Sequence, residues 1–266
     1  MDKSFEIVST MHGNFLINEF DYIGNHIKKN ESWEPHLYNF YSQILTKDDI
    51  CVDAGANLGY HSIQFGNLSK RVYSFEPQPM IFNQLCSNIL FNDLNNIVIP
   101  HRVGLGDKET TAQMWDIENE NFGDVYNWGG RGIEHKDAAY TSNETREEDQ
   151  IQVTLLDFFK IPHCELFKID VQGYEWYTFQ GAQITLTKNY PVILLENNPG
   201  RSELDKKVLF MLQDLGYEGF RYHMESGEDM ILINPKSSKY EVSLKTINQL
   251  QSKYPIKNED ISSYRI

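Results

Sequence analysis

The stretch that most constrains the fold runs from Ile50 to Tyr60 and reads ICVDAGANLGY. Its apolar start ends at Asp53, two glycines follow, and apolar residues then recur at helical spacing. This order predicts a strand, a tight turn and a helix. A second run, Arg71 to Phe75, leads to Glu76, at the place where nucleotide-binding folds hold the ribose. We therefore expect the first βαβ unit of a doubly wound sheet, with a ligand pocket at the carboxyl ends of its strands.

The rest of the chain continues the alternation of strands and helices. Apolar runs at 97–100, 166–170 and 191–196 predict further strands, and stripes of apolar residues between them predict helices. Two later runs, 220–223 and 230–233, predict a closing antiparallel pair. The fold class is therefore α/β, with a doubly wound, mostly parallel sheet of the Rossmann-like kind.

Four predicted strands end on a carboxylate, at Asp53, Glu76, Asp170 and Glu196. One acidic residue at a strand end is often only a helix cap. Because the carboxyl ends of parallel strands share one edge, however, four in succession predict a functional site there.

The charge of the turn narrows the ligand. A dinucleotide site needs a Gly-x-Gly-x-x-Gly turn, and the turn from Gly55 to Gly59 has neither that spacing nor a Walker lysine. A carboxylate at its root, Asp53, repels phosphate and suits a cation. S-adenosylmethionine fits this description, since it carries a sulfonium, an ammonium and a ribose diol but no phosphate.

The motifs, taken in order, resemble the FkbM-type S-adenosylmethionine-dependent methyltransferases. The resemblance covers roughly residues 50 to 217 and rests on VDAGANLGY at 52–60, FEPQP at 75–79, GLGD at 104–107, VTLLD at 153–157, KIDVQGYE at 168–175 and the Leu-Glu pair at 195–196. It implies a class I methyltransferase fold, with a seven-stranded sheet whose terminal strand is antiparallel. It also implies O-methylation of a hydroxyl on a sugar or natural product.

The resemblance further implies a set of cofactor-binding residues. Residues of the glycine turn would surround the methionine part of the donor, Glu76 would bind the ribose, and 103–105 would lie near the adenine. The full set is Asp53, Gly55, Ala56, Asn57, Gly59, Tyr60, Glu76, Pro77, Val103, Gly104, Leu105 and Asp170.

Methyl transfer to a hydroxyl needs a group that removes the proton. Asp170 is the first candidate, because the fourth strand ends there, and Glu175 and Glu196 follow. A histidine, His101 or His135, is an alternative. Another is a divalent cation such as Mg²⁺ or Ca²⁺ held by Asp170 and Glu196 with Glu175.

Substrate choice is expected outside the motif-bearing core. The polar excursion 110–150 contains the aromatic, glycine-rich loop 126–132, whose Asn127, Trp128 and Arg131 we expect to contact the acceptor, together with Asn197. A strand pair such as 112–115 with 152–155 would anchor the excursion. Glu34 and His36 could line the pocket rim, but surface or capping roles are the preferred interpretation.

Composition limits the partners and the setting. A net charge of −14 works against nucleic acid and anionic membranes, so a small molecule or neutral glycan is the expected acceptor. With no apolar span or signal sequence, a cytoplasmic protein is expected. Cys51, Cys86 and Cys164 are expected to be reduced. The expected organisation is a cap at 1–49, a methyltransferase domain at 50–235 and a tail at 236–266.

Three other functions compete with this interpretation. A nicotinamide-dependent oxidoreductase would also use Glu76, but the missing third glycine and Asp53 argue against it. Methyltransferases with other acceptors, a nucleobase or a polyketide, are a second class. The sequence NNPG at 197–200 is reminiscent of the nucleobase enzymes, yet a plain turn explains it better. The third is a binding module that kept the fold without activity.

Overall fold

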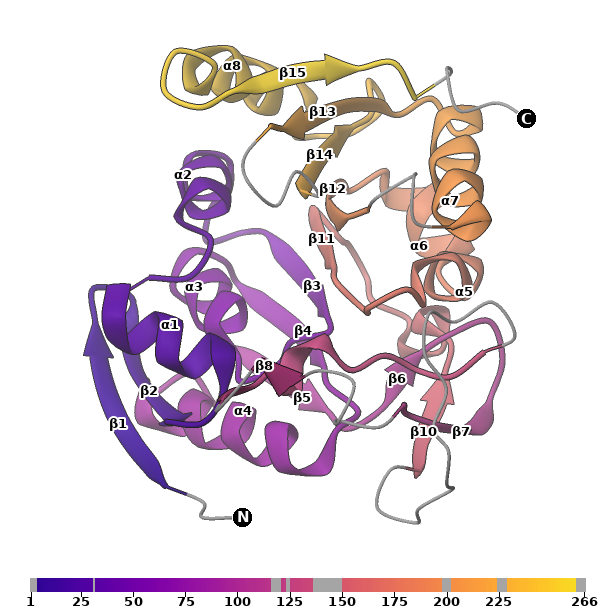
Figure 1. Ribbon diagram of the computed structural model, residues 1–266. Helices are drawn as coiled ribbons and strands as arrows, with labels where there is room; N and C mark the ends of the chain where they lie inside the picture. The colour runs from indigo at the N-terminus through magenta and orange to yellow at the C-terminus, as the bar shows by residue number, and fades with distance from the viewer. Residues whose placement is uncertain are drawn as a thin grey trace.

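The computed structural model describes residues 4–30, 32–115, 121–122, 125–135, 150–197, 202–223 and 229–261. One large sheet crosses the middle of the molecule, with helices on both of its faces (Figure 1). The chain is therefore an α/β protein, as the alternation of strand and helix patterns predicted. Residues 198–200 of the NNPG sequence and Gly227, which lies between the two closing strands, are outside the described residues.

The large sheet has eight strands in the order β15-β13-β14-β12-β11-β3-β4-β5. The five strands from β12 to β5 are mutually parallel, β14 is antiparallel to both of its neighbours, and β15 is antiparallel to β13. In chain order these strands are β3 (Ile50–Ala54), β4 (Arg71–Phe75), β5 (Val98–His101), β11 (Leu166–Ile169), β12 (Val192–Glu196), β13 (Glu218–Tyr222), β14 (Asp229–Ile233) and β15 (Ile256–Glu259).

The expected count of seven strands is one short, because the segment after 235 adds β15 at the sheet edge. That segment also holds helix α8 (Tyr240–Leu250). The sequence of β15 is IKNE, and only Ile256 in it is buried. An edge strand with one buried side chain lacks the alternation that marks a strand in a sequence, which explains why it was missed.

Two sets of helices cover the two faces of the sheet (Figure 1). One apolar core contains side chains of α2, α3, α4 and α8, and the other contains side chains of α5, α6 and α7 or their junctions. Besides α8, the helices are α1 (Tyr22–Asn30), α2 (Pro35–Ile44), α3 (Tyr60–Leu68), α4 (Pro79–Phe91), α5 (Glu175–Gln180), α6 (Gln183–Asn189) and α7 (Glu203–Asp214).

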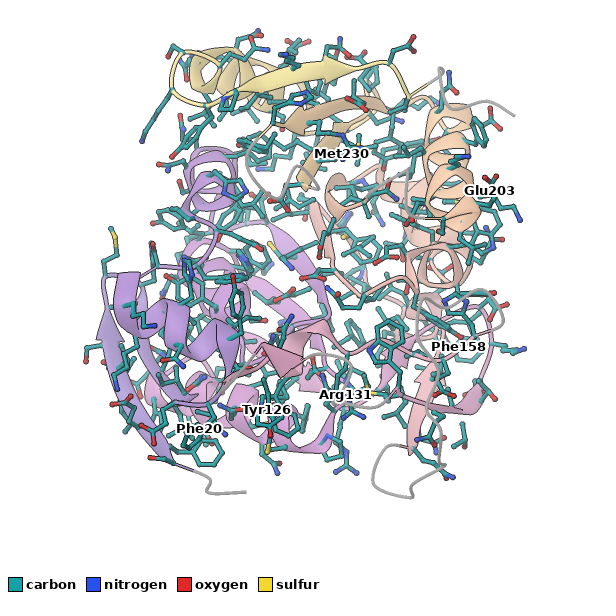
Figure 2. All side chains as sticks on the ribbon, in the orientation of Figure 1. Phe20, Tyr126, Arg131, Phe158, Glu203 and Met230 are labelled. Carbon is teal, nitrogen blue, oxygen red and sulfur yellow. The ribbon has the colours of Figure 1, made fainter. Side chains whose placement is uncertain are left out.

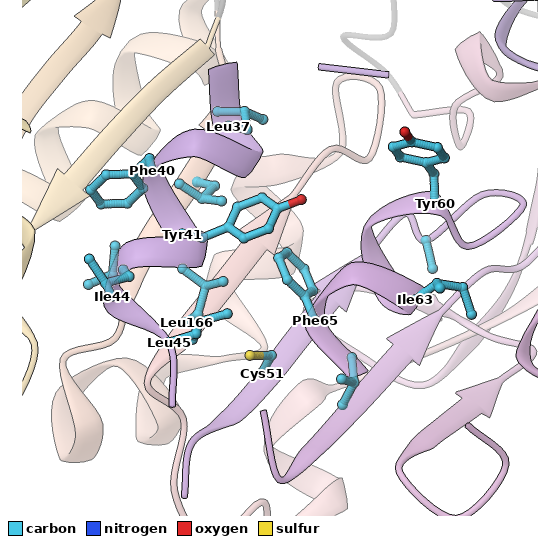
Figure 3. Close-up of a cluster of buried hydrophobic side chains, with 14 of the residues drawn as sticks. Leu37, Phe40, Tyr41, Ile44, Leu45, Cys51, Tyr60, Ile63, Phe65 and Leu166 are labelled. Carbon is cyan, nitrogen blue, oxygen red and sulfur yellow. The ribbon is translucent and has the colours of Figure 1, made fainter. Parts of the chain in front are cut away.

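Helix α2 follows directly from its apolar spacing, since Leu37, Phe40, Tyr41 and Ile44 are all buried. Figure 3 shows Tyr41 of α2 beside Phe65 of α3, with Cys51 of β3 in the same apolar cluster. The opposite side of α2 packs on α8. Helix α2 is thereby fixed above the edge of the sheet where the strands end.

Smaller pieces of sheet complete the fold. β1 (Phe5–Thr10) and β2 (Gly13–Asn18) form a hairpin, and β8 (Asn121–Phe122) pairs with β9 (Val125–Tyr126). A third piece joins β6 (Gly104–Leu105), β10 (Gln150–Thr154) and β7 (Thr110–Gln113). The antiparallel pairing of β7 with β10 confirms that a strand pair anchors the excursion, but both strands begin two residues earlier than predicted. Two short 3-10 turns are η2 (Trp128–Gly130) and η4 (Leu156–Phe159).

The three cysteines are free thiols; Cys51 and Cys164 are buried and Cys86 is partly buried. Burial raises the pKa of the Cys86 thiol, which keeps it protonated and unreactive at neutral pH. No helix within the described ranges has the length and apolar character that crossing a membrane requires.

Candidate functional site

A cavity of about 450 Å³ opens at the carboxyl ends of the central strands. Its walls come from the ends of β3, β4, β11 and β12, from the start of β14, from α1 and α2, and from the segment 127–133. The volume lies within the range of small-molecule sites. The order of the strands places Glu76 near one end of the cavity and Asp229 near the other.

The Glu76 end is built by the glycine turn. The Glu76 carboxylate accepts hydrogen bonds from the backbone N–H groups of Asn57, at 3.0 Å, and Gln78, at 2.8 Å. Asn57 itself stands in the left-handed region with φ 52°. Burial raises the pKa of Glu76 to about 7, although the two backbone donors oppose that rise. Each carboxylate oxygen keeps a further lone pair, so the group can accept two more hydroxyl donors.

Beside Glu76 the cavity wall is apolar and flat. Phe75, Val103, Leu105, Met114 and Ile133 line it together with Gly104. A Cβ on Gly104 would stand 2.9 Å from the Ile133 side chain, so the glycine lets these elements close up. An apolar surface next to a carboxylate with two free acceptor positions has the chemistry that an adenosine requires. Of the expected cofactor residues, Gly55, Asn57, Glu76, Pro77, Val103, Gly104, Leu105 and Asp170 line the cavity.

Asp53 does not line the cavity, contrary to its expected contact with the donor. It is 1% exposed, and its Oδ2 accepts a hydrogen bond from Ser62 Oγ of α3 at 2.5 Å. In the sheet it stands beside Lys168, whose pKa its charge helps to raise. Its side chain points beneath the turn because residues alternate along β3, so any effect on a ligand acts through this buried network.

Ala56, Gly59 and Tyr60 are also absent from the cavity wall. Tyr60 begins α3, where its ring stacks on Phe15 of β2 at 4.8 Å between centroids. Gly59 has φ 93°, which suits glycine, and it passes against Leu85 of α4. These three positions shape the turn and its packing on the N-terminal hairpin, which the motif alone does not distinguish from ligand contact.

At the centre of the cavity, Asp170 is held by two neighbours. Lys168 Nζ lies 3.4 Å from Asp170 Oδ2, and Gln172 Nε2 donates to Asp170 Oδ1 at 2.6 Å. Burial acts to raise the pKa of Asp170, but the Lys168 charge and its hydrogen-bond partners outweigh it and hold the pKa low. Asp170 is therefore a fixed anion and a weak proton acceptor.

The amide of Gln172 bridges Asp170 and Glu196, the two carboxylates predicted as metal ligands. The same Nε2 donates to Glu196 Oε2 at 3.2 Å, so an amide lies between Asp170 and Glu196. Within the described ranges no group of three or more metal-binding side chains forms. Glu175, the other proposed base or ligand, is 2% exposed, and its Oε1 accepts from Gly173 N at 3.1 Å outside the cavity wall.

A short roof segment, residues 127–132, closes the cavity over the turn. Trp128 O accepts from Gln78 Nε2 at 2.9 Å, and Trp128 N donates to Asp21 Oδ1 at 3.3 Å. Arg131, which is labelled in Figure 2, donates a hydrogen bond from Nε to Trp115 O at 2.9 Å. All residues of the roof segment except Trp128 line the cavity. The expected position of Asn127 and Arg131 at the site is thus observed, whereas the Trp128 backbone, and not its ring, ties the roof down.

Asn197, expected at the acceptor, lies elsewhere. It is fully buried, and its Nδ2 donates to the backbone oxygen of Asp205 at 3.3 Å. Its own carbonyl oxygen accepts from Arg221 at 2.7 Å. Asn197 therefore joins the start of α7 to β13. The histidines proposed as bases are also outside the wall: His101 packs between Phe75 and Phe159, and His135 packs on Tyr174 and Tyr177.

The N-terminal segment contributes a wall that the sequence interpretation placed at the surface. Glu34 and His36 both line the cavity, as do Tyr22, His26 and Trp33. Glu34 makes no helix-capping hydrogen bond with its side chain; it stands at φ 44° and accepts from His61 Nε2 at 2.8 Å. The preferred surface or capping role is therefore wrong. The left-handed conformation of Glu34 before Pro35 is strained, but it is seen only in the structure, so the sequence offered no clear signal for this wall.

Asp229 was not singled out at all. It begins β14, and because β14 is antiparallel its first residue lies beside Glu196, the last residue of β12. The first residue of an antiparallel strand thus reaches the same edge as the last residues of the parallel ones. That rule of topology, rather than any motif, could have identified it.

Known proteins resemble this chain in sequence and in fold. The model of the methyltransferase FkbM domain matches residues 53–222. The solved FkbM methyltransferase of Methylobacillus flagellatus KT is 18% identical, with a TM-score of 0.50, over 79% of this chain and 52% of that one. The tRNA m1G37 methyltransferase of Methanocaldococcus jannaschii is 14% identical, with a TM-score of 0.47, over 89% and 59% of the two chains.

One curated relative matches over a shorter stretch. It is the tRNA(Phe) (4-demethylwyosine(37)-C(7)) aminocarboxypropyltransferase of Methanocaldococcus jannaschii, 37% identical over 57 residues, which are 21% of this chain and 23% of that protein. The chain thus spans only about a quarter of this relative and about half of the solved FkbM enzyme. The family model, in contrast, covers residues 53–222, which include the ends of β3, β4, β11 and β12 at the cavity. The chain belongs to the family of the methyltransferase FkbM domain.

Proposed function

We propose that this methyltransferase takes S-adenosylmethionine as its donor and methylates a hydroxyl of a small, uncharged acceptor, a sugar or glycan. The observation that carries the proposal is the charge of the cavity wall. Five carboxylates line the described cavity: Glu34, Glu76, Asp170, Glu196 and Asp229. Among lysines and arginines, Arg131 alone is a lining residue there. Such a wall attracts a sulfonium and repels phosphates.

The residues at the Glu76 end fit an adenosyl group. Glu76 offers two acceptor oxygens for the ribose hydroxyls, and Val103 to Leu105 offer an apolar surface for the adenine. Bound there, the donor supplies a methyl group whose carbon–sulfur bond breaks with its electrons left on sulfur. The part of the cavity toward Asp170, Glu196 and Asp229 remains for the acceptor.

The protein's share of the work is orientation and proton removal. The roof segment covers part of the cavity, which reduces the access of water to a reactive sulfonium. Carboxylates in a row can accept hydrogen bonds from several hydroxyls of one sugar and fix which oxygen faces the methyl group. An anionic acceptor would have to approach the same carboxylates, which disfavours sugar phosphates and RNA.

The first test is calorimetric titration with S-adenosylhomocysteine and, in parallel, with NAD. We expect the first to bind and the second not to. Binding of NAD alone would overturn the assignment of the donor and favour an oxidoreductase.

The second test follows transfer of a labelled methyl group to three kinds of acceptor. Neutral methyl glycosides, the corresponding sugar phosphates and a tRNA transcript are compared at equal concentration. We expect label on the neutral glycosides. Preferential labelling of the tRNA would instead place this chain with the RNA-modifying enzymes and contradict the proposed acceptor.

A further inference from the structure

We propose that His36, held by Asp229, is the general base that removes the proton from the acceptor hydroxyl. The inference rests on the proposed function and adds the residue that does the proton transfer. His36 Nε2 lies 2.7 Å from Asp229 Oδ2, and the two side chains are 7% and 14% exposed. Both residues line the cavity.

The pairing with Asp229 uses only one of the two ring nitrogens of His36. Because a carboxylate oxygen accepts a hydrogen bond, Nε2 carries the proton that joins His36 to Asp229. In the neutral ring, Nδ1 then has a bare lone pair. Nδ1 makes no hydrogen bond to any residue that the structure describes, and it is not among the buried side-chain atoms left without a partner. A ligand in the cavity can therefore reach it.

The ring is also fixed in orientation. The Tyr222 ring meets it edge-on at 4.8 Å between centroids, and Tyr222 OH donates to the His36 backbone oxygen at 3.3 Å. His36 lies in the first turn of α2, which packs on α8. An imidazole oriented by a buried carboxylate and a packed ring has the arrangement by which an enzyme selects a tautomer and stabilises the imidazolium.

Three of the other carboxylates in the cavity wall are already held by neighbouring side chains. Lys168 and Gln172 hold Asp170, and the same Gln172 amide holds Glu196. Glu34 is paired with His61, and its pKa is lowered by that histidine and by Lys168 although burial opposes the shift. A proton acceptor works best when its pKa lies near the operating pH. Among side chains, imidazole is the type that meets this condition without a large perturbation.

The place of His36 suits an acceptor at the end of the cavity opposite Glu76. Going across the sheet, the wall presents Glu76 after β4, Asp170 after β11, Glu196 at the end of β12 and Asp229 at the start of β14. Glu196 and Asp229 are directly paired in the sheet. His36 therefore stands beyond the centre of the cavity, on the side left for the acceptor when the donor occupies the Glu76 end.

The proton transfer balances simply. As the acceptor oxygen forms its bond to carbon with one lone pair, the electrons of its O–H bond stay on oxygen and the proton passes to His36 Nδ1. The imidazolium formed is stabilised by the Asp229 carboxylate, and it releases the proton to water after the product leaves. The charged groups that face this pair are Glu34, Lys168 and Glu196, with the Tyr222 hydroxyl packed against it.

The decisive measurement is the tautomer of His36, read from the ring nitrogens by NMR on the full chain saturated with S-adenosylhomocysteine. At pH 8 we expect a neutral ring protonated at Nε2, with Nδ1 bare. A ring protonated at Nδ1, or one still doubly protonated at pH 8, would overturn the proposal. Loss of the Nε2 resonance pattern in Asp229→Leu assigns the signal.

Kinetics supply the second arm, with the neutral glycoside that accepts label as substrate. We expect His36→Gln to lower kcat by about 100-fold or more, and Asp229→Asn by about tenfold, with less than about a twofold change in S-adenosylhomocysteine affinity by calorimetry. The matched control is His135→Gln, outside the cavity wall. Unchanged kcat in His36→Gln would refute the base, whereas failure of every variant to bind S-adenosylhomocysteine would refute the donor instead.

Discussion

The backbone of Gly55 lies directly against the carbonyl oxygen of Asp170: a Cβ built on Gly55 would stand 1.7 Å from that oxygen. The contact joins the turn after β3 to the end of β11, the two elements on either side of the cavity floor. The turn and Asp170 can therefore approach each other only because the side chain of residue 55 is a single hydrogen atom.

Gly55→Ala is the first prediction. Gly55 has φ +77° and a backbone atom in the way, so alanine must displace β11 as well as adopt a left-handed conformation. We expect a loss of roughly 3 kcal/mol or more in the free energy of unfolding, measured by urea denaturation. The control is Gly173→Ala, which also has positive φ but nothing within 4 Å; it should cost only about 1–2 kcal/mol. Equal costs would show that the contact is unimportant.

The second prediction concerns Glu76 and pH. Its pKa in the folded protein is about 7, raised by burial, against 4.5 for the unfolded chain. Between these values the folded state holds a proton that the unfolded state has lost, so stability falls as pH rises from about 4.5 to 7. Glu76→Gln removes this dependence. We expect the stability of the variant relative to the wild type to improve by roughly 1–3 kcal/mol from pH 5 to pH 8. A constant difference across that range would contradict it.

Ligand affinity should move in the opposite direction. Ribose hydroxyls donate to the ionised carboxylate, so wild-type affinity for S-adenosylhomocysteine should rise with pH through about 7. Glu76→Gln should bind more weakly and lose this rise, which calorimetry at pH 6 and pH 8 measures. A parallel rise in the variant would show that another group is responsible.

The third prediction separates the backbone of the roof segment from its aromatic ring. Gln78→Leu removes the hydrogen bond to Trp128 O, and a net loss of about 1 kcal/mol corresponds to roughly fivefold weaker S-adenosylhomocysteine binding. Trp128→Ala keeps both backbone hydrogen bonds and should weaken binding less. The control, Gln180→Leu, changes a glutamine on α5 outside the cavity wall. A larger effect from Trp128→Ala would mean that the ring itself covers the ligand.

The fourth prediction concerns the buried lysine. Lys168 is 5% exposed and is attracted by Asp170, Glu34, Asp53 and Glu196. Lys168→Met leaves these carboxylates uncompensated, so we expect a loss of roughly 3–5 kcal/mol at pH 8. The loss should be smaller at pH 5, because the unpaired carboxylates then take up protons.

Its control is Lys206→Met, which breaks an exposed pair with Glu203 whose side chains are 32% and 61% exposed. That change should alter stability by less than about 1 kcal/mol. Urea denaturation at pH 5 and pH 8 measures the free energy of unfolding of both variants. If Lys168→Met lost the same stability at both pH values, Lys168 would act through packing alone.

Local sequence patterns were enough to predict the Glu76 half of the cavity and most of the strands of the sheet. The glycine turn, Glu76, the 103–105 stretch and Asp170 lie within one or two elements of each other along the chain, so spacing and strand order were enough to bring them together. Spacing could not say which way a side chain points within the turn. Asp53 and Tyr60 belong to the same motif as Asn57, yet both pack away from the cavity.

The other half could not be derived from local patterns. His36 and Asp229 are 193 positions apart, and their pairing depends on α2 packing over the sheet edge and on β14 running against its neighbours. The bridging role of Gln172 likewise depends on side-chain geometry rather than residue type. Residues of this kind become visible only when the strand order and direction are known.

The span between His36 and Asp229 has a consequence for biosynthesis. During translation, domains fold from the N-terminal end of the chain. The Glu76 half of the cavity can therefore form while the later strands are still inside the ribosome. His36 can pair with Asp229 only after β14 has left the ribosome. A nascent chain of this protein could therefore capture its donor early, yet it would remain chemically silent until synthesis was almost finished.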